Sequence, residues 1–258
     1  MSGRERTSAG GAVPSEAMEW WRDMFTSPAW QAVQLAWETD ADDADDDVHH
    51  VWHALGLSPG ARVLDVPCGT GRIAARLAER GCRPIGIDAV EAFARVASER
   101  GVPVVVGDMR TALARPSRFD AAVCWWGSFG YFDEEGDRAQ AAAAADALVP
   151  GGRYVIDVPV ADTVLPAFEP EGSWEVGGVS VHEARRYDED TRRIETTWTF
   201  TRDGARESRA TSVRLYTVVE LMELLSGVGF STFQALDGDL QPFQAGAERL
   251  RLVAATPD

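Results

Sequence analysis

The chain has 258 residues, of which 45% are hydrophobic and 26% are charged, and its formal net charge at pH 7 is −16. This composition is typical of a globular protein with one large core, or with a core and a small added subdomain, and it excludes a disordered chain. The negative charge would repel nucleic acid and anionic membranes, so the expected partner is a small molecule. The chain has neither an apolar run of membrane-spanning length nor a signal-peptide core at its start, so we expect a cytoplasmic protein.

The basic and sulfur-containing residues exclude two further kinds of chemistry. The sequence contains no lysine, which excludes a lysine base or a lysine Schiff base. It contains three cysteines and no CxxC pair, so neither a disulfide framework nor a zinc site is indicated. We interpret Cys68 and Cys124, which fall at the ends of predicted strands, mainly as packing residues, with a reactive role as the alternative.

The N-terminal region predicts a disordered tail over 1–14 and a helical segment over 15–57. Ser15 can cap the first helix and Pro28 can open the second. Four tryptophans within 18 residues make this segment too apolar to remain in water, so it must cover something. We expect a lid over the site or plain packing against the core, and the segment suits an interface of a homodimer equally well.

An acidic and histidine-rich stretch follows these helices. Asp40 to Asp47 holds six aspartates, which predict a solvated loop and a favourable negative charge at the start of the next helix. His49 and His53 share a helix face and could ligate a metal with the aspartates, but no HExxH pattern is present. We therefore predict no metal site.

Strands and helices alternate from Arg62 onward, which predicts a doubly wound, seven-stranded Rossmann-like α/β sheet with a terminal antiparallel strand. Residues 58–160 form its first part and 217–258 its last, with a helix capped by Thr217. Residues 173–216 alternate polar and apolar side chains, so the segment 161–216 is predicted to be a small antiparallel insertion over the acceptor site. The predicted strands are 62–66, 83–88, 102–106, 119–125, 152–158, 230–236 and 249–255, and the helices between them are 71–80, 90–100 and 135–148.

The stretch from Val63 to Arg72 predicts a strand that stops at a glycine turn and passes into a helix. Such a turn leaves backbone N–H groups facing a crevice, and Gly69 and Gly71 let a ligand approach the main chain. The spacing fits a dinucleotide fingerprint with Asp88 as the ribose-binding acid, a pattern that is weak when taken alone. Asp65 before the loop and Gly107-Asp108-Met109 after the third strand favour S-adenosylmethionine instead.

Five ordered motifs resemble the class I S-adenosylmethionine-dependent methyltransferases, in particular small-molecule enzymes such as amino-sugar and natural-product N-methyltransferases. The motifs are Val63–Arg72, Gly86-Ile87-Asp88, Gly107-Asp108-Met109-Arg110, Phe119–Cys124 and Leu148-Val149-Pro150-Gly151-Gly152. The resemblance implies S-adenosyl-L-methionine as the cofactor, with Asp88 on the ribose hydroxyls and Asp108 on the adenine amino group. It implies cofactor contacts from Asp65, Pro67, Cys68, Gly69, Gly71, Arg72, Asp88, Ala89, Gly107, Asp108, Met109, Cys124 and Trp125.

The segment after the fourth strand lies where this family faces its acceptor. We expect Tyr131 to bond or deprotonate the acceptor, with structural packing as the alternative. His182 and Tyr216, on or next to the insertion, are further candidates for a catalytic role, and a surface position would be the plainer explanation for His182. The expected substrate-binding residues are Trp21, Trp126, Ser128, Phe129 and Arg214.

The expected function is methyl transfer from S-adenosylmethionine to a nitrogen of a small molecule such as a natural-product, amino-acid or sugar intermediate. Oxygen or carbon acceptors are less favoured, because no convincing base stands out among the candidates. Two alternatives stay open at this point: an enzyme that uses the methionine carbons of the cofactor and releases methylthioadenosine, and a cofactor-binding scaffold without activity.

Overall fold

The computed structural model describes residues 19–38, 41–111, 118–244 and 246–258. The predicted tail over 1–14 and the Ser15 cap lie outside these ranges. The chain begins with three helices, of which the second opens at Pro28 as predicted, with the Ser27 hydroxyl accepting from the Trp30 N–H. No helix of the described residues is long and apolar enough to cross a membrane. These helices are α1 (Trp20–Phe25), α2 (Pro28–Trp37) and α3 (Ala41–Leu55).

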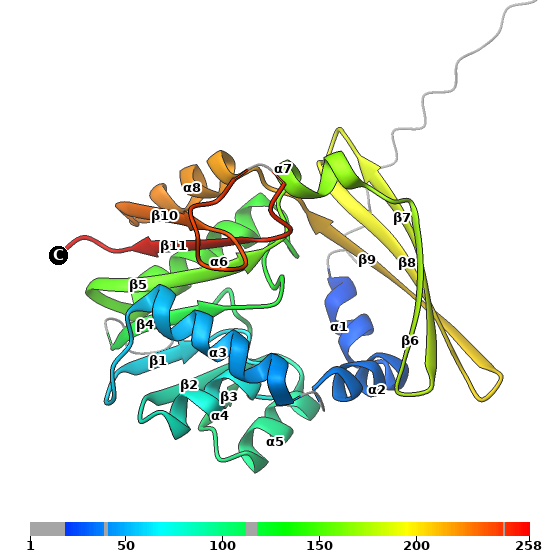
Figure 1. The fold of residues 1–258 in the computed structure, drawn as a ribbon, viewed down its shortest axis with the longest axis horizontal. Coiled ribbons are helices and arrows are strands. Elements are labelled where there is room, and N and C mark those ends of the chain that lie inside the picture. The colour runs from blue at the N-terminus through cyan, green and yellow to red at the C-terminus, as the bar shows by residue number, and fades with distance from the viewer. Residues whose placement is uncertain (1–18, 39–40, 112–117, 245) are drawn as a thin grey trace, which may run out of the picture.

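A seven-stranded sheet forms the core, and its strand order is β10-β11-β5-β4-β1-β2-β3 (Figure 1). Strands β5 to β3 in this order are parallel, whereas β11 runs antiparallel between β5 and β10. The predicted doubly wound sheet with an antiparallel strand at its end is therefore confirmed. The strands are β1 (Arg62–Asp65), β2 (Arg83–Asp88), β3 (Val104–Val106), β4 (Phe119–Cys124), β5 (Leu148–Val158), β10 (Thr232–Leu236) and β11 (Leu250–Ala255).

Side chains alternate between the two faces of this sheet, and each face packs against helices. Val63 and Val123 lie in a cluster with Leu77 of α4 and with Val51 of α3. Their chain neighbours point to the other face, where a second cluster involves α6 and α8. The helices are α4 (Arg72–Glu79), α5 (Glu91–Glu99), α6 (Glu134–Ala147), α7 (Ala161–Val164), the 3-10 turn η2 (Leu165–Ala167) and α8 (Val218–Ser226).

Most boundaries lie within two residues of the predictions, but the starts of α3 and β5 differ more. Helix α3 begins at Ala41 and so includes most of the aspartate run, and its apolar positions Val48 and Val51 reach the core. Strand β5 begins at Leu148, directly after α6, and includes the Pro150-Gly151-Gly152 turn that was expected to separate the two elements. Thr217 caps α8 through a complete capping box with Glu220, as predicted.

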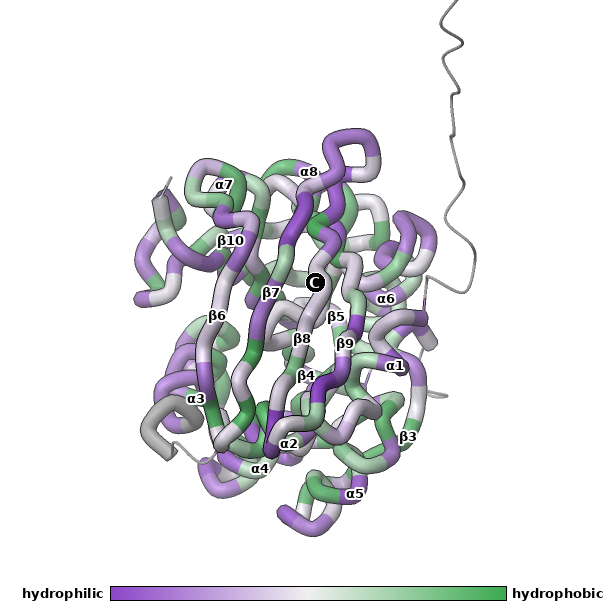
Figure 2. The backbone as a smooth tube through the Cα atoms, turned by 90° about the vertical axis from the view of Figure 1, so that its right-hand side faces the viewer, coloured by the Kyte–Doolittle hydropathy of each residue, from purple (hydrophilic) through white to green (hydrophobic). Residues whose placement is uncertain are grey.

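The insertion forms a second, four-stranded antiparallel sheet with the strand order β6-β7-β8-β9. Figure 2 shows these strands side by side in front of the rest of the molecule. The Arg202–Ala205 pair closes the β8–β9 hairpin around Asp203 and Gly204, both with positive φ, where the hairpin turn was predicted. The strands are β6 (Glu171–Val176), β7 (Val179–Asp188), β8 (Arg193–Arg202) and β9 (Ala205–Arg214).

Helices α1 and α2 lie between the core sheet and this inserted sheet (Figure 1). Met24 and Val33 of these helices form a buried cluster with Val181 and Phe200 of the inserted sheet. Helix α3 packs instead on α4 and β5 of the core. The segment 15–57, expected to be one helical lid, therefore divides between two layers, since only α1 and α2 join the inserted sheet.

Candidate functional site

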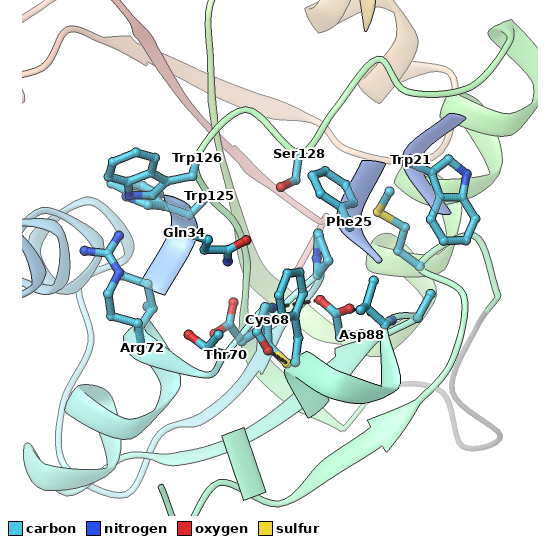
Figure 3. Close-up of a pocket in the computed structure, with 18 of the residues that line it drawn as sticks. Trp21, Phe25, Gln34, Cys68, Thr70, Arg72, Asp88, Trp125, Trp126 and Ser128 are labelled. Carbon is cyan, nitrogen blue, oxygen red and sulfur yellow. Dashed lines mark hydrogen bonds between the residues drawn. The ribbon is translucent and has the colours of Figure 1, made fainter. Parts of the chain in front are cut away.

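A pocket of about 1260 Å³, counting its open mouth, lies at the carboxyl ends of β1, β2 and β4. Its floor is the loop after β1, and α1 and α2 cover it. Figure 3 shows Trp126 and Arg72 at one end and Trp21 and Asp88 at the other, with Gln34 and Thr70 between them. Open α/β sheets bind ligands at this edge, where the connections diverge to opposite faces.

The two glycines of the loop serve different purposes. Gly69 has φ +53° and lines the pocket, and a Cβ there would come within 3.5 Å of the Gln34 amide nitrogen. Gly71 has φ +77° and caps α4, and a Cβ there would lie 2.7 Å from Ala97 Cβ of α5. Gly71 does not line the pocket. Close packing between α4 and α5 therefore accounts for the glycine at position 71, and its expected ligand contact stays a prediction.

Asp88 closes the loop from the end of β2. Its carboxylate accepts the Gly69 N–H at 2.8 Å and the Val90 N–H at 2.8 Å. Burial raises the pKa of Asp88 to about 6, although these two N–H donors act in the opposite direction. The carboxylate is thus fixed at the pocket wall and retains lone pairs for further donors.

Asp65 lies at the end of β1 and is 2% exposed. Its Oδ2 atom has no hydrogen-bond partner among the described residues, and the side chain lines the pocket. Burial raises the pKa of Asp65 to about 7, against a smaller opposing effect of the Ala74 N–H. A buried carboxylate with an unpaired oxygen is the usual sign of a missing donor or cation.

Asp108, which follows β3, also lines the pocket but is already paired. The Arg110 Nε atom lies 3.0 and 3.1 Å from the two carboxylate oxygens of Asp108, and the Arg110 guanidinium sits 4.2 Å from the Phe132 ring centroid. Burial alone would raise the pKa of Asp108, yet the hydrogen bonds and charge of Arg110 hold it below its usual value. The neighbouring Gly107 and Met109 line the pocket beside it, and so do Pro67, Cys68 and Ala89.

A continuous row of aromatic rings forms the roof. Phe25 of α1 contacts Trp30 of α2 at 5.9 Å between ring centroids, and Trp30 contacts Trp37 at 5.8 Å. On its other side Phe25 contacts Tyr131 at 5.9 Å. Trp21 lines the same pocket, as predicted. The pocket side of α2 is built from positions 30, 34, 37 and 38, which share one helix face.

Helix α2 is also bonded to the loop that it covers. The Glu38 carboxylate accepts from Thr70 Oγ1 at 2.6 Å and from Arg100 Nη2 at 3.0 Å. Arg100 Nη1 in turn donates to Thr70 Oγ1 at 2.9 Å. These three side chains close a ring of bonds between α2, the glycine loop and the end of α5. We refer to them as the Glu38 latch.

Asp47 of α3 supports three pocket-lining residues, a role that the sequence did not reveal. Its Oδ1 accepts from Trp125 Nε1 at 2.9 Å, and its Oδ2 accepts from Trp126 Nε1 and from Arg72 Nη2, both at 2.7 Å. The interpretation of the aspartate run as solvated is therefore wrong for this member. The indication in the sequence was its position one residue before Val48, which places it beside the buried face of an amphipathic helix.

The β4–α6 loop, residues 125–133, carries Trp126, Ser128 and Tyr131 into the pocket. Arg193 of the inserted sheet holds this loop, donating to the carbonyls of Gly130, Tyr131 and Phe132 at 3.3, 3.2 and 2.7 Å. Burial raises the pKa of Tyr131 well above its usual value, so the phenolate that could act as a base does not form near neutral pH.

Three residues expected to act on the acceptor lie elsewhere. His182 is exposed on β7, because strand alternation turns it away from the buried neighbours Val181 and Glu183. Tyr216 is buried and donates to Asp137 Oδ2 at 2.8 Å. Arg214 forms an ion pair with Glu220 and stacks on Tyr216. None of the three lines the pocket.

Two further candidates belong to the core. Phe129 is buried in the cluster under α6 and α8, where it contacts Tyr216 at 5.8 Å. Cys124 is fully buried, and its Sγ lies 3.3 Å from the Ser128 carbonyl oxygen. No group of metal-ligating side chains is found among the described residues, His49 and His53 included.

Comparisons with known proteins identify the core. Residues 63–152 match a family model described as a methyltransferase domain. The chain contains a methyltransferase domain. The demethylmenaquinone methyltransferase of Corynebacterium efficiens is 32% identical over 114 residues, which are 44% of this chain and 48% of that enzyme. The chain spans between 37% and 48% of the length of the curated relatives that it matches.

Solved structures extend the likeness of the methyltransferase domain to the whole chain. A structure of CalS10 with bound SAM, an amino pentose methyltransferase from Micromonospora echinaspora, superposes with a TM-score of 0.64 and 22% identity over 95% of this chain and 99% of that one. The sugar N-methyltransferase KedS8 from a Streptoalloteichus species gives a TM-score of 0.62 at 22% identity, over 100% and 99% of the two chains. At these identities the likeness establishes a shared fold, insertion included.

Proposed function

We propose that this protein is an S-adenosylmethionine-dependent methyltransferase that methylates a nitrogen atom of a small molecule. The observation that carries the proposal is the orphaned oxygen of Asp65, which lies in one pocket with the Asp88 carboxylate and with a glycine loop that lacks a Cβ at position 69. The methyltransferase domain over 63–152 and the neighbouring folds support the same assignment.

The pocket residues fit this cofactor. Asp65 would pair with the ammonium group of the methionine part, which would give its unpaired oxygen a partner. Asp88 would accept from the ribose hydroxyls with its remaining lone pairs. Met109 and Phe93 would hold the adenine ring from apolar sides.

The chain's own contribution to catalysis would be positioning and the exclusion of water. When bound, S-adenosylmethionine supplies a sulfonium methyl carbon to the attacking nitrogen and leaves as S-adenosylhomocysteine. The aromatic row of α1 and α2 would shield the reacting atoms from solvent, and Ser128 and Tyr131 would border the acceptor. Nitrogen is favoured because a neutral amine needs no base, whereas a hydroxyl does, and Tyr131 is a poor one.

The test combines cofactor binding with product analysis. Calorimetry should show that Asp88→Ala and Asp88→Asn weaken S-adenosylmethionine binding by at least about tenfold, because each removes a charge-assisted acceptor. The exposed Asp146→Asn serves as the matched control and should bind normally. Mass spectrometry with a panel of amines should detect S-adenosylhomocysteine and a product heavier by one methylene. Release of methylthioadenosine, or undiminished binding by both Asp88 variants, would contradict the proposal.

A further inference from the structure

A row of stacked indoles stands at the end of the pocket away from Asp88. Trp126 and Trp37 line the pocket with their ring centroids 6.4 Å apart and a tilt of 35°. Trp174 of the inserted sheet stacks on Trp37 at 5.0 Å with a tilt of 27°. The Trp126 side chain is 51% exposed, although its neighbour Trp125 is buried. A large ring left half open inside a pocket presents an apolar face to a ligand.

The orientation of the Trp126 ring is fixed before any ligand arrives. Its Nε1 donates to Asp47, its backbone N–H donates to Asp157 Oδ2 at 3.1 Å, and the Arg72 guanidinium lies 5.1 Å from the ring centroid. Asp157 is itself buried and accepts two hydrogen bonds from Arg249, at 3.0 and 2.6 Å. The backbone of Trp126 has φ +60°, an uncommon conformation for a bulky residue that these contacts maintain.

The charged side chains near this end of the pocket are already paired. Arg72 bonds Asp47, and Glu38 bonds Arg100, while Asp108 at the other end bonds Arg110. Among the described lining residues, the uncharged polar side chains of this half are Gln34, Thr70 and Ser128, and Thr70 belongs to the Glu38 latch. An acceptor with many hydroxyl groups would leave several of them without partners, at a substantial free-energy cost.

We infer that the acceptor is a flat, uncharged conjugated ring, such as a nitrogen heteroaromatic or an aryl amine, that stacks on the exposed face of Trp126 beside Trp37. The inference rests on the proposed methyl transfer and names its substrate class. A planar ring gains offset stacking on a pre-oriented indole and makes few demands for hydrogen bonds, which Ser128 and Gln34 can meet. An amino sugar has neither the flat face nor the small number of polar groups.

Ligand binding to the complex with S-adenosylhomocysteine tests this choice. The probes are naphthalene carboxamide and its saturated counterpart decahydronaphthalene carboxamide, which differ in flatness at equal charge and similar size, and glucosamine, which represents an amino sugar. Calorimetry should show the flat amide binding about tenfold or more tightly than either other probe. Equal binding of the two amides, or tighter binding of glucosamine, would overturn the inference.

Variants of Trp126 test whether its indole ring binds the flat probe. Trp126→Ala should weaken binding of the flat probe by about tenfold, and Trp126→Phe, which keeps a flat ring but loses the bond to Asp47, by less than about threefold. Both variants should bind S-adenosylmethionine normally. An equal loss of cofactor affinity would place Trp126 in the cofactor half and overturn the inference. Methyl transfer to sugar amines alone would also overturn the inferred substrate class, but it would leave the proposed function intact. Failure of the protein to bind S-adenosylmethionine would refute the proposed function itself.

Discussion

At the scale of single residues, the pocket is distinguished by two carboxyl groups whose ionisation is disfavoured by burial. Asp65 and Asp88 are buried at the ends of adjacent strands, and burial raises their pKa values to about 7 and about 6. No cationic side chain of the described residues hydrogen-bonds or forms an ion pair with either carboxylate. In the free protein Asp65 therefore titrates near neutral pH and Asp88 about one pH unit lower, and a cationic ligand would compete with the protons that they bind.

This competition predicts that cofactor affinity depends on pH. An ammonium group at Asp65 and hydroxyl donors at Asp88 favour the ionised carboxylates, so binding lowers both pKa values and releases protons. The affinity for S-adenosylmethionine should therefore rise from about pH 5 to about pH 8 and then level off. Calorimetry in buffers of different ionisation enthalpy would measure the released protons. Asp65→Asn should remove the increase in affinity at the higher end of this pH range. A pH-independent affinity in the unmodified protein would contradict the roles assigned to Asp65 and Asp88.

A second prediction concerns the two roles of glycine. Gly71→Ala should lower stability by about 1–3 kcal/mol beyond the cost of its backbone conformation, because the new Cβ meets Ala97. Gly101→Ala is the matched control, since Gly101 has a similar φ of +83° but no atom within 4 Å of the added Cβ. Thermal unfolding of the two variants gives the difference directly. Equal losses would mean that packing between α4 and α5 contributes nothing.

Three of the expected site residues line the pocket because their positions follow from their own strand ends. Asp65 and Asp88 are the last residues of the largely buried strands β1 and β2, and Asp108 lies two residues after the more exposed edge strand β3. Parallel strands bring these carboxyl ends to one edge of the sheet. Asp47 was missed because its partners Trp125 and Trp126 are almost 80 residues away, and no local pattern links them. The outward position of His182 could have been anticipated, since it alternates with the valines at 179 and 181.

At the scale of elements, α2 is the part of the roof with a definite attachment to the floor. Its apolar side packs on the inserted sheet, its pocket side carries Trp30 and Trp37, and the Glu38 latch joins its end to the glycine loop. The sequence predicted a helix here and a lid as one of three roles. It did not show the latch, because Thr70 and Arg100 come from two other elements.

The latch predicts a change in cofactor release. Glu38→Gln removes the charge that Thr70 Oγ1 and Arg100 share, and it should speed dissociation of S-adenosylmethionine by about tenfold, because hydrogen bonds to a charged group are the stronger ones. Stopped-flow fluorescence would measure the dissociation rate. Glu19→Gln is the control, since its ion pair with Arg22 is exposed and should contribute little. An unchanged rate in Glu38→Gln would show that the latch does not hold the roof.

At the scale of the whole molecule, two segments far apart in the chain form one covering layer. Helices α1 and α2 and the sheet β6–β9 pack together over the pocket, while α3 remains with the core (Figure 1). The sequence predicted the sheet over 173–216 and the helices separately. Their association depends on long-range apolar contacts such as that of Trp30 with Phe200, which no local pattern reveals.

This arrangement predicts how protection spreads on cofactor binding. Hydrogen exchange should slow in residues 20–37 of the roof as well as in 69–72 of the loop, because a ligand between them stabilises the closed state. The β10–β11 hairpin, at the far edge of the sheet, should exchange at its original rate and serves as the internal control. Protection confined to the loop would mean that α1 and α2 do not close on the cofactor.

The grip of Arg193 on three successive carbonyls has a consequence for engineering. The conformation of the β4–α6 loop depends partly on Arg193, which lies some 60 residues later in the chain. The loop and the inserted sheet should therefore be exchanged together when a chimera is built. A chimera that takes only the insertion from a relative would lose the matched contacts between Arg193 and the β4–α6 loop. Crossover points placed before residue 125 and after residue 216 would transfer the loop and the inserted sheet together. The chimera should then show the acceptor preference of the protein that donated this segment.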